Sequence, residues 1–297
     1  MRVVLLGTAA DGGFPQWNCA CALCSAARDG KLPARTQDCV AVSGNSRDWW
    51  LLNASPDIRT QLNATPALAP GPGPRGAPVR GVLLTDAETD HVMGLTVLRG
   101  PGLKVYAAPP VLAALSPLRA LLDRPTPWEW ADSLTEGGFV LAGGLVVSAH
   151  PVGSKAPRHL AGAVADDRWT TAYRIEDLAS GGVLVYAPCL GEWTPVLDDL
   201  LTEATCVLLD GTIYAAGATD TTVRAYRGRT AEQRLPGHLP VSGADGSLAA
   251  VARHPGPRVV YTHLDGANPL LDPATDACAS VTGAGAEILP DGTELVL

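Results

Sequence analysis

Short apolar runs rich in valine and leucine recur along the whole chain, each bounded by glycine, proline, asparagine or aspartate. Buried strands interrupted by turns have this pattern. It predicts about ten strands, at residues 2–7, 40–44, 49–55, 79–86, 103–108, 144–150, 181–188, 206–212, 258–264 and 286–290.

Segments of helical length separate several of these runs, at residues 56–68, 91–100, 109–123, 193–204 and 246–256. The early runs follow one another as hairpins and the later ones alternate with helical segments. This order favours two mixed sheets with helices on both outer faces. The Pro/Gly stretch 69–78 should be an exposed connection. We therefore expect one α/β (α+β) domain over residues 1–297.

Net charge and hydropathy restrict the kinds of partner that the protein could bind. The net charge is −8 and no basic stripe is present, which argues against nucleic acid. The apolar run before Gly7 is too short for a signal segment, and no run approaches the roughly 18 apolar residues of a membrane span. We expect a cytoplasmic protein without a membrane span, and the composition permits a homodimer.

Seven cysteines, an odd number, argue against a disulfide framework in a cytoplasmic chain. Three of them, Cys19, Cys21 and Cys24, form a CxCxxC motif in a loop at residues 17–25. Thiolates this close together are typical of a structural Zn²⁺ site, which needs one more ligand. The other four should be small buried residues, namely Cys39, Cys189, Cys206 and Cys278.

Polar side chains follow four of the predicted strands, in the stretch "TDAETDH" (85–91) and at His150, Asp210 and His263. In layered α/β folds, sites assemble at the carboxyl ends of strands, so these endings predict one shared cleft. Carboxylate and imidazole groups together suit a divalent transition metal. Asp90 alone could instead cap a helix that begins near His91.

The stretch "TDAETDH" resembles the HxHxDH signature of the metallo-β-lactamase superfamily. Asp90 and His91 are retained, while Asp86 and Glu88 replace the two leading histidines. Motifs in the same order from Arg2 to about Asp272 resemble the coenzyme PQQ biosynthesis protein B family, namely "LLGTAADGGFPQWNCACALC", "NASPDIR", "LLTDAETDHVMGL", "SKAP", "DGT", "GHLPVSG" and "THLDGANPLLDP".

This resemblance implies the αββα sandwich of two mixed sheets. It also implies a role in making pyrroloquinoline quinone (PQQ) from a precursor peptide whose Glu and Tyr have been crosslinked, in company with other PQQ-pathway proteins. A structural zinc at the CxCxxC loop is implied as well. In a phosphodiesterase branch of the superfamily a downstream histidine completes that site, but Gly266 stands there in this chain. Asp265, Asn268 or a distant cysteine could replace it.

Loss of both leading histidines disfavours a dinuclear zinc hydrolase. Asp90 and His91, with His263 at the place of the superfamily's late ligand, leave two histidines and one carboxylate. A mononuclear iron(II) oxygenase has this ligand set, although zinc and manganese accept it too. The resemblance thus favours an Fe²⁺-dependent hydroxylase acting on a tyrosine-derived ring. The alternatives are a non-catalytic carrier of PQQ or its precursor, and a metal-dependent hydrolase.

The resemblance assigns further residues around this centre. Asp210 matches the superfamily's bridging carboxylate, and His238 is an additional ligand or supports one. Asp86 and Glu88 could hold solvent, orient ligands or bind substrate amines. An acidic substrate would also need cations, because guanidinium and ammonium groups bind carboxylates. The candidates are Lys155, Arg59 and Arg158.

Overall fold

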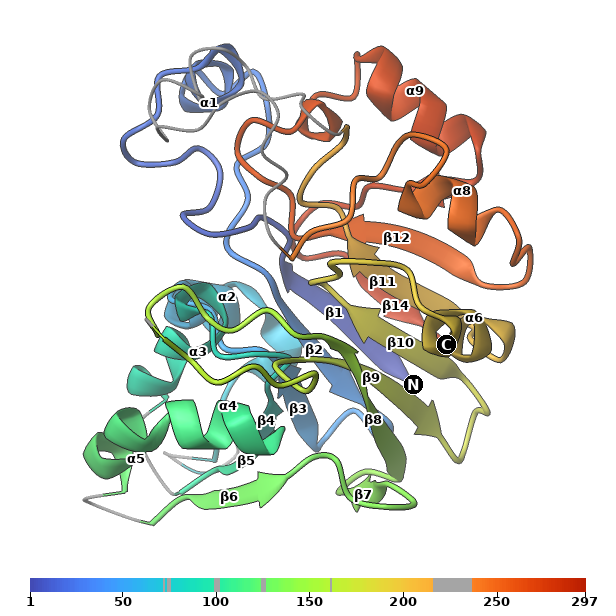
Figure 1. Cartoon of the computed structure of the whole chain (residues 1–297). Helices are drawn as coiled ribbons and strands as arrows, with labels where there is room; N and C mark the ends of the chain where they lie inside the picture. Colours follow the sequence, from blue (N-terminus) through green and yellow to red (C-terminus); the bar gives the residue numbers. More distant parts are fainter. Residues whose placement is uncertain (72, 74–75, 99–101, 124–126, 161, 216–236) are drawn as a thin grey trace.

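The computed structural model describes residues 1–71, 73, 76–98, 102–123, 127–160, 162–215 and 237–297. Within them, two seven-stranded mixed sheets pack against each other (Figure 1). The first has the order β14-β1-β2-β3-β4-β5-β6, and the second has the order β13-β12-β11-β10-β9-β8-β7.

The first sheet contains β1 (Arg2–Gly7), β2 (Cys39–Ser43), β3 (Trp49–Leu52), β4 (Val79–Leu83), β5 (Lys104–Ala107), β6 (Glu129–Asp132) and β14 (Glu294–Val296). The second contains β7 (Phe139–Leu141), β8 (Leu145–Gly153), β9 (Thr170–Asp177), β10 (Val183–Ala187), β11 (Cys206–Asp210), β12 (Arg258–Thr262) and β13 (Ala286–Glu287).

The helices are α1 (Ala22–Arg28), α2 (Ile58–Ala64), α3 (Thr89–Val92), α4 (Pro109–Ala114), α5 (Ser116–Leu122), α6 (Pro195–Thr202), α8 (Ser247–Val251) and α9 (Asp276–Gly283). Short 3₁₀ turns are η1 (Pro66–Leu68), η2 (Met93–Thr96) and η3 (Pro269–Leu271). No helix among the described residues has the length and apolar character to cross a bilayer.

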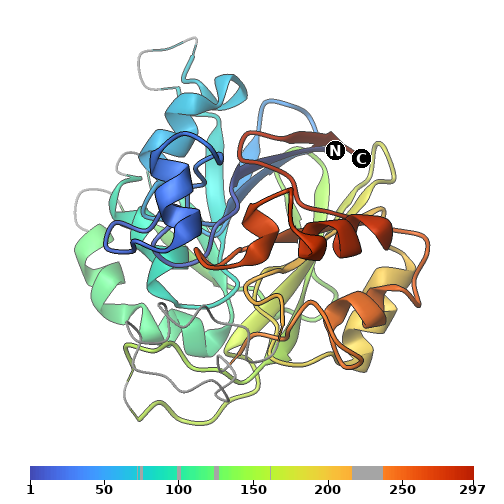
Figure 2. The same ribbon diagram turned by 90° about the horizontal axis from the view of Figure 1, so that it is seen from above.

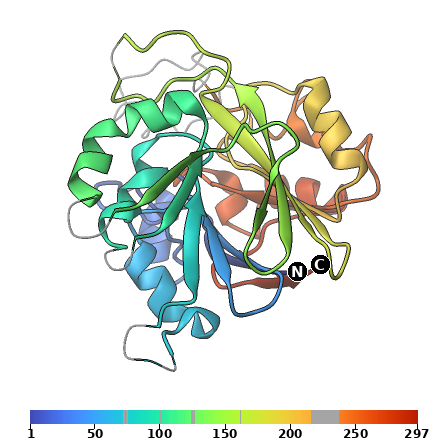
Figure 3. The same cartoon turned by 90° about the horizontal axis from the view of Figure 1, so that it is seen from below.

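Alternation along the strands builds three apolar layers. In β1, Val3 and Leu5 pack toward the other sheet, whereas Val4 and Leu6 pack toward the helices on the outer face. Successive strand side chains point to opposite faces, so one strand serves two cores. Helices α2 to α5 cover the first sheet, and α6, α8 and α9 cover the second. Figures 2 and 3 show the two helical layers on opposite sides. The predicted αββα sandwich is confirmed.

All ten predicted runs contain strands, but β6, β7, β9 and β14 were not predicted. Polar residues interrupt β9, and the other three are short, so none stands out as a long apolar run. Helices α1 and α9 were also missed. The segment 109–123 divides into α4 and α5, where Pro117 occupies the first turn of α5. The connection 69–78 lies partly outside the described residues.

Each sheet contains a set of neighbouring parallel strands, and these sets determine where a site can form. Strands β3 to β6 are parallel in the first sheet, and β10 to β13 are parallel in the second. Parallel strands deliver their carboxyl ends to one edge of a sheet. The stretch 85–91 follows β4, while Asp210 ends β11 and His263 follows β12. The distant "TDAETDH" and "YTHL" segments therefore meet.

Candidate metal centre

His91 is completely buried and is held from one side by Asp86. Its Nδ1 atom lies 2.9 Å from each carboxylate oxygen of Asp86. Thr85 and the backbone amide of Glu88 donate to the same carboxylate, which fixes its position. The other ring nitrogen, Nε2, has no hydrogen-bond partner among the described residues. An aligned imidazole with an unbonded buried nitrogen is the arrangement expected of a metal ligand.

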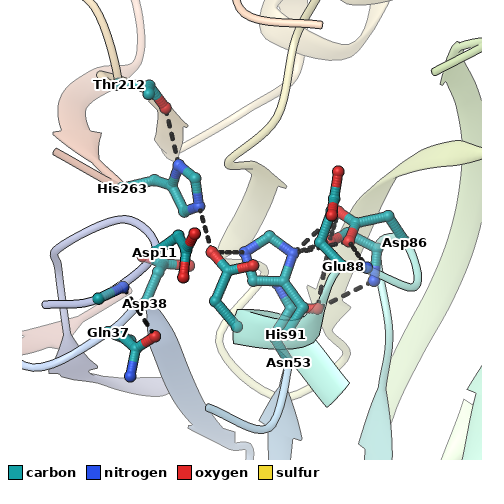
Figure 4. A network of polar contacts seen from close by, with 12 residues as sticks. Asp11, Gln37, Asp38, Asn53, Asp86, Glu88, His91, Thr212 and His263 are labelled. Atoms are coloured by element: carbon teal, nitrogen blue, oxygen red, sulfur yellow. Dashed lines mark hydrogen bonds and ion pairs between the residues drawn. The ribbon is translucent and has the colours of Figure 1, made fainter. Parts of the chain in front are cut away.

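His263 faces His91 across a ring-to-ring distance of 5.0 Å (Figure 4). Its Nδ1 lies 2.7 Å from Thr212 Oγ1, and its Nε2 lies 3.2 Å from Asp90 Oδ2. The same Asp90 oxygen is 3.8 Å from His91 Nε2. His263 adopts φ 57°, a left-handed conformation that is uncommon outside glycine and is often found at functional sites. Two imidazole nitrogens and one carboxylate oxygen thus face a shared space.

Charge in this buried cluster is balanced between neighbours. Burial favours the neutral forms of Asp86 and Asp90, but His91 outweighs it. The pKa of Asp86 falls to about 2, and the pKa of Asp90 falls well below its ordinary value. Burial likewise opposes the charged form of His91, yet Asp86 and Asp90 raise its pKa to about 10. Two ionised carboxylates around a buried ring provide a setting that a divalent cation fits.

Asp90, His91 and His263 therefore fit a divalent metal by donor chemistry and by the unbonded His91 Nε2. Asp90 lies in the first turn of α3, whose N-cap is Glu88, so the alternative of Asp90 as the cap is wrong. His263, which follows β12, lies close to Asp90 on α3: the distance between His263 Nε2 and Asp90 Oδ2 is 3.2 Å.

Asp210 joins His238 to the Thr212–His263 pair. Its Oδ2 lies 2.8 Å from His238 Nδ1 and accepts the Leu190 amide at 2.8 Å. Its Oδ1 accepts the Thr212 amide at 2.9 Å and the Thr212 hydroxyl at 2.6 Å. These four bonds occupy both oxygens, which favours a positioning role for Asp210. Asp210, His238 and His263 nevertheless bring donor atoms within 4.8 Å of one another.

Glu88 contacts two of the three basic residues that were predicted to bind substrate. Its Oε1 lies 2.9 Å from Lys155 Nζ and 3.8 Å from Arg158 Nε, and its Oε2 accepts the Arg158 amide at 3.3 Å. Lys155 is mostly buried, with 18% of its side chain exposed, whereas Arg158 is half exposed. Arg59 is exposed on α2 and makes no polar contact with this group within the described residues. The structure thus brings together Lys155, Arg158 and Glu88 without Arg59.

Two buried residues of the centre were not predicted. Cys189, beyond the end of β10, shares with His91 and His263 a group of donor atoms that all lie within 4.8 Å of one another. Burial, together with Asp86 and Asp210, raises the pKa of its thiol well above the ordinary value. Because Cys189 follows an apolar strand run, the rule that singled out other strand endings could have found it.

Asp38 is the second unpredicted residue, and it precedes β2. It accepts hydrogen bonds from Tyr186 and Thr262, and burial raises the pKa of its carboxyl. No pattern in the sequence distinguishes Asp38.

The prediction that placed His150 at a strand end is wrong, because His150 lies inside β8 and pairs with Ser148 at 2.9 Å. The centre draws on three of the four predicted strand endings.

The CxCxxC motif spans a loop and the first turn of α1, a helix that was not predicted, so the loop expected at residues 17–25 ends before Ala22. Cys19, Cys21 and Cys24 bring their sulfur atoms within 4.8 Å of one another at the start of α1. The Gly266 carbonyl lies 3.9 Å from Cys21 Sγ and 3.7 Å from Cys24 Sγ. Within the described ranges, no fourth histidine, cysteine or acidic side chain joins the three sulfur atoms.

The candidates for the fourth zinc ligand have other contacts. The Asn268 side chain donates to the carbonyls of Gly211 and Thr212 and accepts the Leu270 amide, which makes it the N-cap of η3. Asp265 accepts the amide of Ala267 at 3.0 Å. Asn268 is therefore engaged in fixing the loop beside the centre. The four remaining cysteines are buried, as predicted.

Known proteins resemble this chain over its whole length. The β-lactamase superfamily domain model matches residues 48–264. The coenzyme PQQ synthesis protein B of Methylococcus capsulatus is 37% identical, and that of Azoarcus sp. is also 37% identical; in both cases all of each chain is covered. The crystal structure of Zn²⁺-bound PqqB from Methylobacterium extorquens has a TM-score of 0.90 and 35% identity, with both chains fully covered.

A diphosphatase of the PhnP family is similar in fold, with a TM-score of 0.70 at 17% identity, and the whole of this chain and 97% of that one are covered. Identity this low supports the fold alone. The match to the superfamily domain and the full-length relatives at 37% identity together show that the chain belongs to the coenzyme PQQ synthesis protein B family of the β-lactamase superfamily.

Proposed function

We propose that this protein acts in PQQ synthesis as an iron-dependent oxygenase that hydroxylates a tyrosine-derived ring of the PQQ precursor. One observation carries the proposal: Asp90, His91 and His263 converge as one carboxylate and two imidazoles in a buried site. Non-haem iron(II) oxygenases use this ligand set and keep open positions for their reactants. The names of the full-length relatives support the pathway.

Each part of the site has a role in this chemistry. When bound, iron(II) would activate dioxygen for insertion of one oxygen atom into the ring. The two electrons that reduce the other oxygen atom to water would come from a catechol-type substrate or from an added two-electron reductant. With a metal bound, Asp86 would hold the His91 proton on Nδ1 and leave the lone pair of Nε2 to the metal. Thr212 orients the His263 ring in the same way. Asp90, His91 and His263 are each less than a tenth exposed, which limits bulk water at the centre and with it side reactions.

Binding of an acidic precursor falls to Lys155 and Arg158. In the structure both face Glu88, and Lys155 contacts it at 2.9 Å. A substrate carboxylate would take over the ammonium group from Glu88, and charge-assisted contacts of this kind orient a substrate strongly. These cations would suit a small polycarboxylate, and the resemblance to the PQQ synthesis family implies one derived from crosslinked Glu and Tyr. A structural Zn²⁺ at the CxCxxC loop completes the proposal.

Metal content and oxygen uptake test the function. Protein purified without air and loaded with iron should consume O₂ in the presence of a dihydroxyphenylalanine-type substrate. His263→Ala should lose this uptake together with the cleft metal. His159→Ala, which changes an exposed histidine, is the matched control and should keep both.

The outcomes separate the three functions. Equal O₂ uptake by wild type and His263→Ala would refute the assignment of His263. A carrier would bind PQQ tightly and turn over nothing. A hydrolase would release product without consuming O₂.

A further inference from the structure

Cys189 lies beside the proposed metal ligands and has the features of a donor. Its Sγ belongs with one nitrogen each of His91 and His263 to a group of atoms that all lie within 4.8 Å of one another. The residue is only 5% exposed and is not in a disulfide. Most buried cysteines serve as small apolar residues, so this proximity needs an independent observation before it indicates a site.

His91 supplies that observation. Its Nε2 is buried and has no hydrogen-bond partner among the described residues, although buried polar atoms in folded proteins are nearly always bonded. Asp86 occupies the opposite ring nitrogen. A cation held between Cys189, His91 and His263 would bond this nitrogen and explain its orientation.

The fold fixes the backbone next to Cys189. The amide of Leu190 donates to Asp210 Oδ2 at 2.8 Å, and the carbonyl of Leu190 accepts the amide of Leu239. The loop after β10 is thereby tied to the end of β11 and to the neighbour of His238. Parallel pairing of β10, β11 and β12 brings Cys189 to the same edge as His263. The thiol is positioned by the elements that position the histidines.

We propose that Cys189 binds the active-site metal through its thiolate, in addition to Asp90, His91 and His263. This inference rests on the proposed metal site and adds one ligand to it. Metal binding would take the sulfur in its thiolate form and release its proton to solvent. The resulting set has two nitrogens, one oxygen and one sulfur.

A sulfur ligand has consequences for which metal binds and what it leaves open. Thiolate favours zinc, cobalt and iron over magnesium and calcium. Four protein ligands fill a tetrahedral zinc site, whereas a six-coordinate iron keeps two positions for reactants. Cys189 would therefore make zinc a tight but closed occupant and would leave iron open to its substrates.

Cobalt(II) spectroscopy tests the ligand directly, because a thiolate bound to cobalt produces an intense near-ultraviolet charge-transfer band. Wild type, Cys189→Ser and Cys189→Ala are titrated with Co²⁺, and the spectra of the variants are subtracted from that of wild type. The CxCxxC loop is identical in all three, so its contribution cancels in the difference. Cys206→Ser, which changes a fully buried cysteine on β11, is the matched control for folding.

We expect a charge-transfer band in the difference spectra of both Cys189 variants and none in that of Cys206→Ser. Affinity for Co²⁺ or Zn²⁺, measured by chelator competition, should fall roughly tenfold or more in the Cys189 variants while affinity for Mg²⁺ changes little. A flat difference spectrum with unchanged Co²⁺ affinity would overturn the proposal. Absence of any cleft metal in wild type would instead overturn the proposed function, so the two failures are distinguishable.

Discussion

Both carboxylate oxygens of Asp86 lie 2.9 Å from the Nδ1 atom of His91. Asp86 occupies the first of the two positions at which the superfamily signature carries its leading histidines. Its side chain does not face the shared space between His91 and His263 but lies on the far side of the His91 ring (Figure 4). The exchanged residue has become the group that orients a retained ligand.

Substitution of Asp86 should weaken metal binding without removing a ligand. In Asp86→Asn the His91 ring loses its charged acceptor, so affinity of the cleft for Zn²⁺ or Fe²⁺ should fall on the order of 10–100-fold. Chelator competition measures this affinity. Glu88→Gln, two residues along the same turn, is the control and should keep the wild-type affinity. Equal affinity in both variants would show that Asp86 does not support His91.

Removal of one thiol from the CxCxxC loop should release one zinc per chain. In Cys24→Ser the sulfur that lies at the buried start of α1 is lost, and a structural zinc stabilises the fold around it. Elemental analysis should show one zinc fewer, and the melting temperature should drop. Cys278→Ser, a buried cysteine outside the sulfur cluster, should keep its zinc. A wild-type protein without zinc in this loop would contradict the assignment.

Neutralising Lys155 should impair binding of an acidic substrate more than its conversion. Loss of one charge-assisted contact predicts a rise in KM of about 10-fold to 100-fold in Lys155→Met, with a smaller change in kcat. Lys155→Arg should recover part of the affinity because it keeps the positive charge. Lys104→Met removes a partly exposed lysine that lies 3.5 Å from Glu129 and serves as control. The same KM in all four proteins would exclude Lys155 from substrate binding.

Acid should loosen the contact that Asp198 makes between α6 and the residues after α8. Burial opposes ionisation of this carboxylate, but contacts with His254 at 2.7 Å, Trp193 at 3.1 Å and Arg253 at 3.0 Å hold its pKa below 3.8. Because the folded-state pKa is the lower one, the stabilisation is present above the unfolded-state pKa and is lost as pH falls through the folded-state value.

Asp198→Asn should therefore lower the free energy of unfolding by about 0.5–1 kcal/mol at pH 7 and by progressively less below pH 4. Urea unfolding at several pH values measures the difference. Asp199→Asn, on the exposed side of the same helix, should leave the curve unchanged. A difference that persists undiminished at acid pH would mean that the charge of Asp198 is not responsible.

Local sequence determined most of the strands and two clusters of candidate metal ligands. Val3 to Leu6 are apolar without a break, which indicates a strand buried on both faces, and such runs identify ten strands of the two sheets. Asp90 and His91 belong to the stretch that follows β4, so their placement near a sheet edge follows from the chain alone. The crowding of Cys19, Cys21 and Cys24 likewise needs no distant contact.

Tertiary structure decided which of the distant groups meet. His263 reaches Asp90 across 173 positions of sequence because the carboxyl ends of β4 and β12 lie together. Cys189 joins them for the same reason, because it follows the carboxyl end of β10, whereas Cys206 begins β11. Arg59 and Lys155 both carry a positive charge, yet only Lys155 faces Glu88. The direction of a side chain depends on the packing of its element, and packing is a property of the whole fold.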